Sequence, residues 1–207
     1  MVTPAVQRFI DEGLRDPEAF WAQAAEAVPW FKKWERAFEW TFPTFRWFIG
    51  AQTNLAYNAL DHHVANGRGT HPALIYFNER GERQSFTYGE LLDRVTKAAA
   101  ALRGLGLRKG DRLTIYMPTS PEAIVLMLAT VRVGAIHSVV FAGFGARALG
   151  ERIQASGSRL VFTANVTYRK GKEFHLKPIV DEALGLVPHA VEHVVVLQRG
   201  TSPAALN

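Results

Sequence analysis

Two short clusters in the sequence combine residue types that suit the binding of a phosphorylated ligand. The first is the glycine turn Gly143-Phe-Gly145, which follows the apolar run 135–141 and precedes a helical pattern from Ala146 to Ser156. Such a junction directs backbone N–H groups and the positive end of a helix toward an anion. The second is the basic group Arg169-Lys170-Gly171-Lys172, whose size suits one or two phosphates.

The glycine turn also satisfies a dinucleotide fingerprint, because residues 143–148 read G-x-G-x-x-A between a predicted strand and a predicted helix. The next strand ends in Thr163-Ala164-Asn165, which lacks the acid that binds the ribose of NAD. An NADP site would recruit Arg169 instead. The fingerprint lies deep in the chain rather than at the start of a domain, so an NADP-binding Rossmann domain stays open only as an alternative.

No local arrangement predicts a catalytic residue or a metal site. The chain has no cysteine, which excludes disulfides and thiolate ligands. It has no G-x-S-x-G elbow, and Gly171-Lys172 is followed by Glu173, so the basic group is not a Walker A loop. His189 and His193 are four residues apart, but Pro188 precedes them and a strand pattern follows, which is a poor context for a helical ligand pair.

Alternating strand and helix patterns must position these clusters. We expect strands at 73–77, 84–86, 112–116, 135–141, 160–163 and 193–197, the first two joined as a hairpin through the turn 78–82. We expect helices at 54–64, from Thr87 to Gly104, at 121–131, at 146–156 and ending at 186. Thr87 and Glu90 have the spacing of a capping box, and Ser120-Pro121 suits a cap and a first helical residue. This order predicts an α/β fold with a mainly parallel sheet flanked by helices. The run 135–141 is apolar apart from His137 and Ser138, which predicts a strand buried on both faces.

The 207 residues divide into three expected regions. Residues 1–50 hold all five tryptophans and are interrupted by Pro17, Pro29 and Pro43, which predicts a helical, aromatic-rich arm packed on the main body. An aromatic platform for nucleic-acid bases or a membrane surface is the alternative for this arm. Residues 51–197 form the α/β subdomain, and 198–207 lose periodicity and are expected to be a disordered tail.

Composition restricts the partners that the chain can have. Lysine and arginine number 24 against 19 acidic residues, a formal charge of +5, but the basic residues are scattered. The chain therefore lacks the basic stripe of a nucleic-acid-binding protein. No apolar run is long enough to span a bilayer and no leader is apparent, so we expect no membrane partner and a cytoplasmic location.

An ordered series of motifs resembles the N-terminal part of the AMP-forming acyl-CoA synthetases, the adenylate-forming enzymes, and within them the acetate–CoA ligase group. The motifs are Trp47-Phe-Ile-Gly50, Asn54 to His63, Phe86-Thr-Tyr-Gly-Glu90-Leu, Lys109-Gly-Asp111-Arg, Ile115-Tyr-Met-Pro118, Pro121-Glu122-Ala, Arg132 to Phe144, Lys172 to Lys177 and Asp181-Glu182-Ala183-Leu184. They cover residues 20–197. The order of the series is more specific than any one motif.

Enzymes of this family activate a carboxylate with ATP and transfer the acyl group to CoA. The resemblance implies that Phe141, Ala142 and Gly143 lie against the adenine end of CoA, and that Arg169, Lys170, Gly171 and Lys172 meet its phosphates. The family often has glycine where this chain has Ala142 and arginine where it has Lys172. Lysine keeps the charge but loses the bidentate fork, which weakens phosphate recognition.

The resemblance stops before the ATP loop, the acyl pocket and the catalytic C-terminal domain of the family. It therefore implies a portion of the enzyme that is inactive alone and that uses ATP and Mg only with a complementing chain. Half of a split enzyme and a broken reading frame both fit, and a stand-alone CoA- or nucleotide-binding or interaction module is the alternative. The face that the rest of the enzyme would cover is expected to be apolar and to support self-association.

Overall fold

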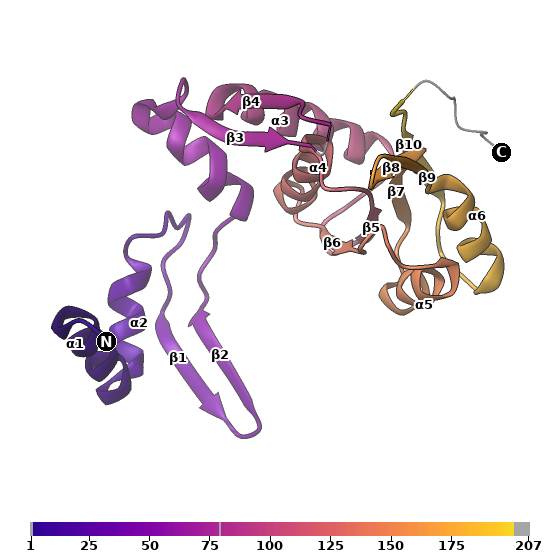
Figure 1. Ribbon diagram of the computed structural model, residues 1–207. Helices are drawn as coiled ribbons and strands as arrows, with labels where there is room; N and C mark the ends of the chain where they lie inside the picture. Colours follow the sequence, from indigo (N-terminus) through magenta and orange to yellow (C-terminus); the bar gives the residue numbers. More distant parts are fainter. Residues whose placement is uncertain (1, 79, 201–207) are drawn as a thin grey trace. The chain divides into compact units, whose positions relative to one another are not determined.

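The computed structural model describes residues 2–78 and 80–200. Two compact units divide the chain at residue 58, Met1–Asn58 and Ala59–Asn207 (Figure 1). The boundary lies eight residues beyond the expected end of the arm, so that the segment 51–58 belongs to the first unit.

The first unit begins with two short helices whose starts follow from local sequence. Thr3 caps α1 (Pro4–Arg15) and Asp16 caps α2 (Pro17–Ala25), and each helix opens with proline. Proline suits the first helical position because its missing N–H has no partner there anyway.

The rest of the arm is not helical, and the expectation of a wholly helical arm is wrong. Strands β1 (Arg36–Thr41) and β2 (Thr44–Ile49) form an antiparallel hairpin. Phe38 and Trp40 alternate with other residues along β1, as do Phe45 and Trp47 along β2, and Phe38 faces Trp47 with ring centroids 4.5 Å apart. A period of two is the pattern of a strand, and it prevails over the reading of proline-separated helices.

The second unit is built on a four-stranded parallel sheet of order β10-β7-β5-β6. The strands are β5 (Arg112–Tyr116), β6 (Ile136–Val139), β7 (Leu160–Ala164) and β10 (His193–Leu197). All three pairings are parallel. The predicted α/β class with a parallel sheet flanked by helices is confirmed.

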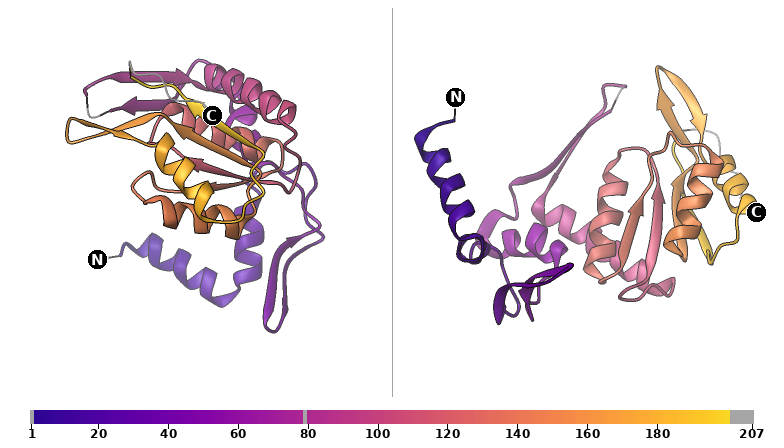
Figure 2. Two further views of the ribbon diagram at one scale, coloured as in Figure 1. Left: turned by 90° about the vertical axis from the view of Figure 1, so that its right-hand side faces the viewer. Right: turned by 90° about the horizontal axis from the view of Figure 1, so that it is seen from below.

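Helices cover both faces of this sheet (Figure 2). On one face, α3 (Tyr88–Gly104) and α4 (Pro121–Arg132) share a core with the side chains of Leu113, Ile115 and Phe162. On the other, α5 (Ala146–Ser156) and α6 (Lys177–Leu186) pack against Tyr116 and Val161. Alternate residues of each strand serve opposite faces, as the period of a strand requires.

Capping signals in the sequence fix where two of these helices begin. Thr87 and Glu90 form the predicted capping box of α3, in which each side chain binds the other residue's backbone N–H. Ser120 accepts a hydrogen bond from the N–H of Ala123, and Pro121 opens α4 as predicted. Both helices therefore start at residues whose side chains satisfy otherwise unpaired N–H groups.

Strand β6 differs from its expected environment. It pairs with β5 alone and forms one edge of the described sheet. Ile136 is 55% exposed and Val139 is 49% exposed, so the prediction of a strand buried on both faces is wrong. An apolar run shows that a strand is suited to burial. Whether the strand lies in the centre or at the edge of the sheet depends on its neighbouring strands, which the run does not specify.

Smaller elements complete the second unit. The π-helical turn η1 (Tyr57–Asp61) lies within the expected helix 54–64, and η2 (Val64–Arg68) continues past its end. Arg132, at the end of α4, donates hydrogen bonds of 2.6 and 2.9 Å to the Asp61 carboxylate. Strands β3 (Pro72–Phe77) and β4 (Arg83–Thr87) form the predicted hairpin. A second hairpin joins β8 (Val166–Arg169) to β9 (Lys172–His175).

The expected disordered tail is ordered where it starts. The N–H of Arg199 donates to Oδ1 of Asn165 at 2.6 Å, and the carbonyl of Arg199 accepts from Nδ2 of the same side chain at 2.7 Å. The prediction of disorder is therefore wrong for this residue. Residues 201–207 of the expected tail lie outside the described part of the chain.

Candidate functional site

A cavity of about 480 Å³ opens at the carboxyl ends of the parallel strands. It is lined by residues from the segments that follow β5, β6, β7 and β10, together with the β3–β4 hairpin: Ile75, Tyr76, Phe77, Asn78, Arg80, Met117, Pro118, Thr119, Phe141, Ala142, Thr167, Tyr168, Arg169 and Arg199. The chain crosses from β6, on one side of β5, to β7 on the other. Ligands of open α/β sheets bind outside the carboxyl ends of the strands at such a switch point.

Phe141 and Ala142, which lead into the glycine turn, line one side of the cavity. A side chain at Gly143 would place its Cβ 2.2 Å from Cε1 of Phe141 and 2.8 Å from Nη2 of Arg169. A side chain at this position would therefore displace the Phe141 ring and the Arg169 guanidinium from their present places. Phe141 itself is 67% exposed, so one face of its ring is available to a ligand.

Arg169 holds the turn to the neighbouring hairpin. Its Nη2 donates to the carbonyl of Ala142 at 2.7 Å, and its guanidinium lies 5.3 Å from the centroid of Phe141 and 5.8 Å from that of Phe174. These contacts hold the guanidinium beside the cavity, and no carboxylate within residues 2–78 and 80–200 forms an ion pair with it. A planar guanidinium in this setting retains donors for an anion.

Tyr116 stabilises the glycine turn through a hydrogen bond. Its hydroxyl donates to the carbonyl of Phe144 at 2.6 Å, and its side chain is fully buried. Burial raises the pKa of Tyr116 above its ordinary value of 10.0, and the positive charge of Arg169 opposes that change in part. The phenol therefore stays protonated and keeps its hydrogen bond over the neutral pH range.

The basic group is the turn of the β8–β9 hairpin. Lys170 and Gly171 occupy its two central positions with φ values of 49° and 73°, and Arg169 pairs with Lys172 across the strands. Two positive φ values in a two-residue loop are typical of a type I′ turn. Arg169 and Lys172 are consequently neighbours, and two adjacent cations favour an anion between them.

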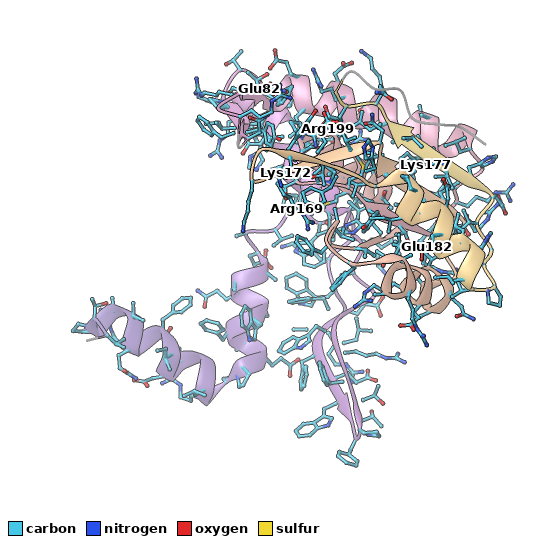
Figure 3. The ribbon with its side chains drawn as sticks, turned by 45° about the vertical axis from the view of Figure 1, so that its right-hand side comes forward. Glu82, Arg169, Lys172, Lys177, Glu182 and Arg199 are labelled. Carbon is cyan, nitrogen blue, oxygen red and sulfur yellow. The ribbon has the colours of Figure 1, made fainter. Side chains whose placement is uncertain are left out.

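The cavity carries positive charge. Arg80, Arg169 and Arg199 line it, and its described lining residues include no aspartate or glutamate. Figure 3 shows Arg169, Lys172 and Arg199 at one end of the sheet, whereas Lys177 and Glu182 lie on α6. Three guanidinium groups around aromatic rings provide hydrogen-bond donors for phosphates and flat surfaces for a base.

The structure brings together some of the sequence-predicted site residues and not others. Phe141, Ala142 and Arg169 line the cavity, whereas Gly143 contacts two of these side chains but is not a lining residue. Lys170, Gly171 and Lys172 belong to the adjoining hairpin turn but are not lining residues.

Sequence reasoning missed Arg80, Tyr168 and Arg199. Arg80 lies in a loop that the sequence predicts only as a turn, and Arg199 falls in the predicted tail. The one usable signal was the position of Arg199 just after a predicted strand, where binding residues of parallel sheets gather.

Asn165 has a structural role that differs from the one a dinucleotide site needs. Its side chain is 3% exposed and holds the backbone of Arg199, so it is not directed at a ribose. Arg169, which an NADP site would recruit, binds the Ala142 carbonyl. The geometry therefore gives the NADP alternative no support.

The described residues contain neither a metal-binding cluster nor a membrane-spanning helix. No group of three or more histidine and acidic side chains there is arranged to hold a metal ion. Across residues 2–78 and 80–200, none of the helices combines the length and apolar character that crossing a membrane requires.

Comparisons with known families match nearly the whole chain. The family of AMP-binding enzymes matches residues 61–206, and the family described as the acetyl-coenzyme A synthetase N-terminus matches residues 6–59. The boundary between the two matches nearly coincides with the boundary between the two compact units.

Individual relatives agree with these matches. An acetyl-coenzyme A synthetase of Deinococcus radiodurans is 47% identical over 95% of this chain, which covers 30% of that relative. A 3-hydroxypropionyl-coenzyme A synthetase of Sulfurisphaera tokodaii is 45% identical over 91% of this chain, which covers 29% of that relative. The chain thus spans about 30% of the length of these curated relatives.

A solved structure has the same fold as most of the chain. The acetoacetyl-CoA synthetase from Streptomyces lividans superposes with a TM-score of 0.81 and 32% identity, covering 90% of this chain and 29% of that one. With a family match over residues 61–206 and relatives of this similarity, the chain belongs to the AMP-binding enzyme family, and it corresponds to an N-terminal portion of its acetyl-CoA synthetase-like members.

Proposed function

We propose that this chain supplies part of the CoA nucleotide site of an acetate–CoA ligase-like enzyme. The observation that carries the proposal is the cavity at the carboxyl ends of the strands, where three arginines meet without an acidic residue in the described lining. An anionic, partly aromatic ligand fits this combination of charge and rings. The names of the relatives, which are acyl-coenzyme A synthetases, agree with that ligand class.

Each site residue has a role in this proposal. The exposed ring of Phe141 stacks against the adenine, and Ala142 and Gly143 allow close approach of the turn. Arg169 and Lys172 bind phosphate oxygens from neighbouring positions, with Lys170 and Gly171 forming the turn between them. Lys172 contributes a point charge rather than a bidentate fork, so Arg169 provides most of the geometric selectivity.

Acyl activation is the part of the reaction that we assign to residues beyond these 207. The chain spans about 30% of its relatives, and its described residues include no cluster suited to a metal ion. ATP and Mg would therefore act at groups that another part of the enzyme, or a complementing chain, provides. We propose that the chain alone binds CoA without forming an acyl-adenylate.

The exposed edge of the sheet supports a partner. Ile136 and Val139 on β6 are about half exposed, and no charged residue or proline protects the strand. Open apolar edges of this kind pair with further strands. We propose that a complementing chain, or a second copy of this one, covers the edge. Lack of CoA binding together with a stable complex would favour a stand-alone interaction module.

Calorimetric titration of the purified chain with CoA, dephospho-CoA, ATP and NADPH tests the proposed ligand. We expect saturable binding of CoA and weaker binding of dephospho-CoA, because loss of the 3′-phosphate removes an anion from a cationic site. Binding of NADPH without binding of CoA would contradict the proposal.

Sedimentation tests the proposed partner surface. We expect concentration-dependent association of the chain, which Val139→Lys reduces by placing a charge on the edge. Glu151→Lys, on the exposed side of α5, is the matched control. Equal association of both variants and the unaltered chain would rule out the β6 edge.

A further inference from the structure

Two arginines of the cavity share one aromatic ring. The guanidinium of Arg80 lies 4.9 Å from the ring centroid of Tyr168, and that of Arg199 lies 5.7 Å from it. Both distances fall in the range of cation–π contacts. All three residues line the cavity of about 480 Å³ and also a neighbouring hollow of about 270 Å³.

This cluster is distinct from the one around the glycine turn. Tyr168 and Arg169 are consecutive residues of β8, and successive side chains of a strand point to opposite faces. Arg169 contacts Phe141 and Phe174, whereas Tyr168 contacts Arg80 and Arg199. The cavity therefore has two cationic clusters that strand β8 separates.

The chain holds Arg80 in place through its own loop. Oδ1 of Asn78 accepts hydrogen bonds of 3.0 Å from the N–H groups of Arg80 and Glu82, which fixes the β3–β4 turn. The Glu82 carboxylate accepts from Nδ2 of Asn78 at 2.6 Å and lies 3.9 Å from Nε of Arg80. Among the described residues, the ion pair of 3.9 Å with Glu82 is the acidic contact of Arg80.

Arg199 is positioned with greater rigidity. Asn165, which is buried, binds both the N–H and the carbonyl of Arg199, and the N–H of Asn165 donates to the carbonyl of Leu197 at 3.0 Å. Because the buried Asn165 amide forms hydrogen bonds with both backbone groups of Arg199, it fixes the backbone from which the Arg199 side chain extends. Such support is typical of a residue whose side chain has a binding role.

Two like charges near one ring repel each other, and an anion that both can reach offsets this repulsion. Guanidinium groups bind phosphate through paired N–H donors. We propose that Arg80 and Arg199, stacked on Tyr168, form a second phosphate subsite of this cavity, so that its ligand carries two separate phosphate groups. Where the ligand is CoA, which has a 3′-phosphate and a 5′-diphosphate, the inference rests on the proposed function.

The first experiment compares variants at the two clusters. Arg80→Gln and Arg199→Gln are each expected to weaken CoA binding about tenfold, as for the loss of one charge-assisted pair. Arg94→Gln is the matched control, because Arg94 stacks on Phe86 at 4.4 Å outside the cavity. The affinity of Arg199→Lys for CoA should lie between that of Arg199→Gln and that of the unaltered chain. Unchanged CoA affinity in both glutamine variants would overturn the subsite.

Dephospho-CoA then separates the two clusters. One set of variants is Arg169→Gln and Lys172→Gln, and the other is Arg80→Gln and Arg199→Gln. If the two clusters hold different phosphates, only one of these sets should weaken the binding of dephospho-CoA, because the other cluster has lost its phosphate. If both sets lose or keep their effects together, the division into two subsites is wrong. Thermal midpoints of all variants check that folding is retained.

Inorganic pyrophosphate distinguishes failure of this inference from failure of the proposed function. If the unaltered chain does not bind CoA but binds pyrophosphate, and Arg199→Gln weakens that binding about tenfold, the CoA proposal fails and the phosphate subsite stands. If pyrophosphate binding is equal in Arg199→Gln and the unaltered chain, or absent, the subsite is overturned.

Discussion

Arginines occur at both ends of the parallel sheet, and their surroundings differ. At the amino ends, Arg159 donates to Asp111 at 2.8 Å and to Glu192 at 2.7 and 2.9 Å, and Nε of Arg112 donates to the carbonyl of Ser156 at 2.8 Å. At the carboxyl ends, Arg169 and Arg199 stack on aromatic rings and have no described acidic partner.

The pKa values at the amino ends follow from this pairing. The N–H of Arg108, with help from Arg159, lowers the pKa of Asp111 below its ordinary 3.8. A hydrogen bond from Arg159 likewise lowers the pKa of Glu192 below 4.5. The same fold therefore uses arginine in two ways. Paired arginines tie strands together, and arginines without acids are available to a ligand.

The largest expected effect is loss of binding at the carboxyl ends. Arg169→Ala removes a phosphate donor and the hydrogen bond that holds the Ala142 carbonyl, so CoA affinity should fall about a hundredfold, corresponding to about 2.7 kcal/mol. Calorimetry measures the affinity, and urea unfolding should show a loss of stability of about 1 kcal/mol, because a single hydrogen bond is removed. A large loss of stability with unchanged affinity would reverse the roles of the two ends.

A smaller effect on CoA affinity is expected at Asn165, which contributes to stability and also positions Arg199. Asn165→Ala removes both hydrogen bonds to the backbone of Arg199 and should lower the free energy of unfolding by about 2 kcal/mol. CoA affinity should fall as well, because Arg199 is no longer held. Retained affinity at protein concentrations where the variant is folded would show that Arg199 does not need this support.

Arg112→Ala tests the amino ends alone. Loss of its hydrogen bonds to the Ser156 and Gly157 carbonyls should reduce the free energy of unfolding by about 1.5 kcal/mol. CoA affinity should be unchanged, since Arg112 is the first residue of β5 and the cavity lies beyond the last residue of that strand. A parallel fall in affinity would mean that the two ends are coupled through the strand.

The smallest effect is in the pH dependence of stability. A carboxyl group with a lowered folded-state pKa contributes stability that is present above its unfolded pKa and is lost as the pH falls through the folded pKa. Stability should therefore decline below about pH 4, and Asp111→Asn should make that decline shallower. Unfolding curves at several pH values measure it. Identical acid profiles would show that Asp111 is not a source of the effect.

Local features of the fold were predictable and burial was not. The capping box of Thr87 and Glu90 and the Ser120-Pro121 start of α4 depend on residues within one turn, and both are confirmed. The exposure of β6 depends on its place at the edge of the sheet, which its own sequence does not encode. Aromatic alternation in 36–49 was a readable strand signal that the prolines obscured.

The sequence predicts only the part of the candidate site that consists of contiguous motifs. The glycine turn and the basic turn each occupy a few consecutive residues, so their chemistry is visible in the sequence. Arg80, Tyr168 and Arg199 come from three distant segments that the sheet brings to one cavity. Their cluster depends on tertiary contacts, and no spacing in the sequence predicts it.

Side-chain NMR of the arginine Nε–Hε groups during a CoA titration tests the contrast between the two ends most directly. We expect the signals of Arg169, Arg80 and Arg199 to shift and saturate together while those of Arg112 and Arg159 stay in place. Equal shifts at both ends, or shifts confined to Arg112 and Arg159, would contradict the assignment of the carboxyl ends as the binding site.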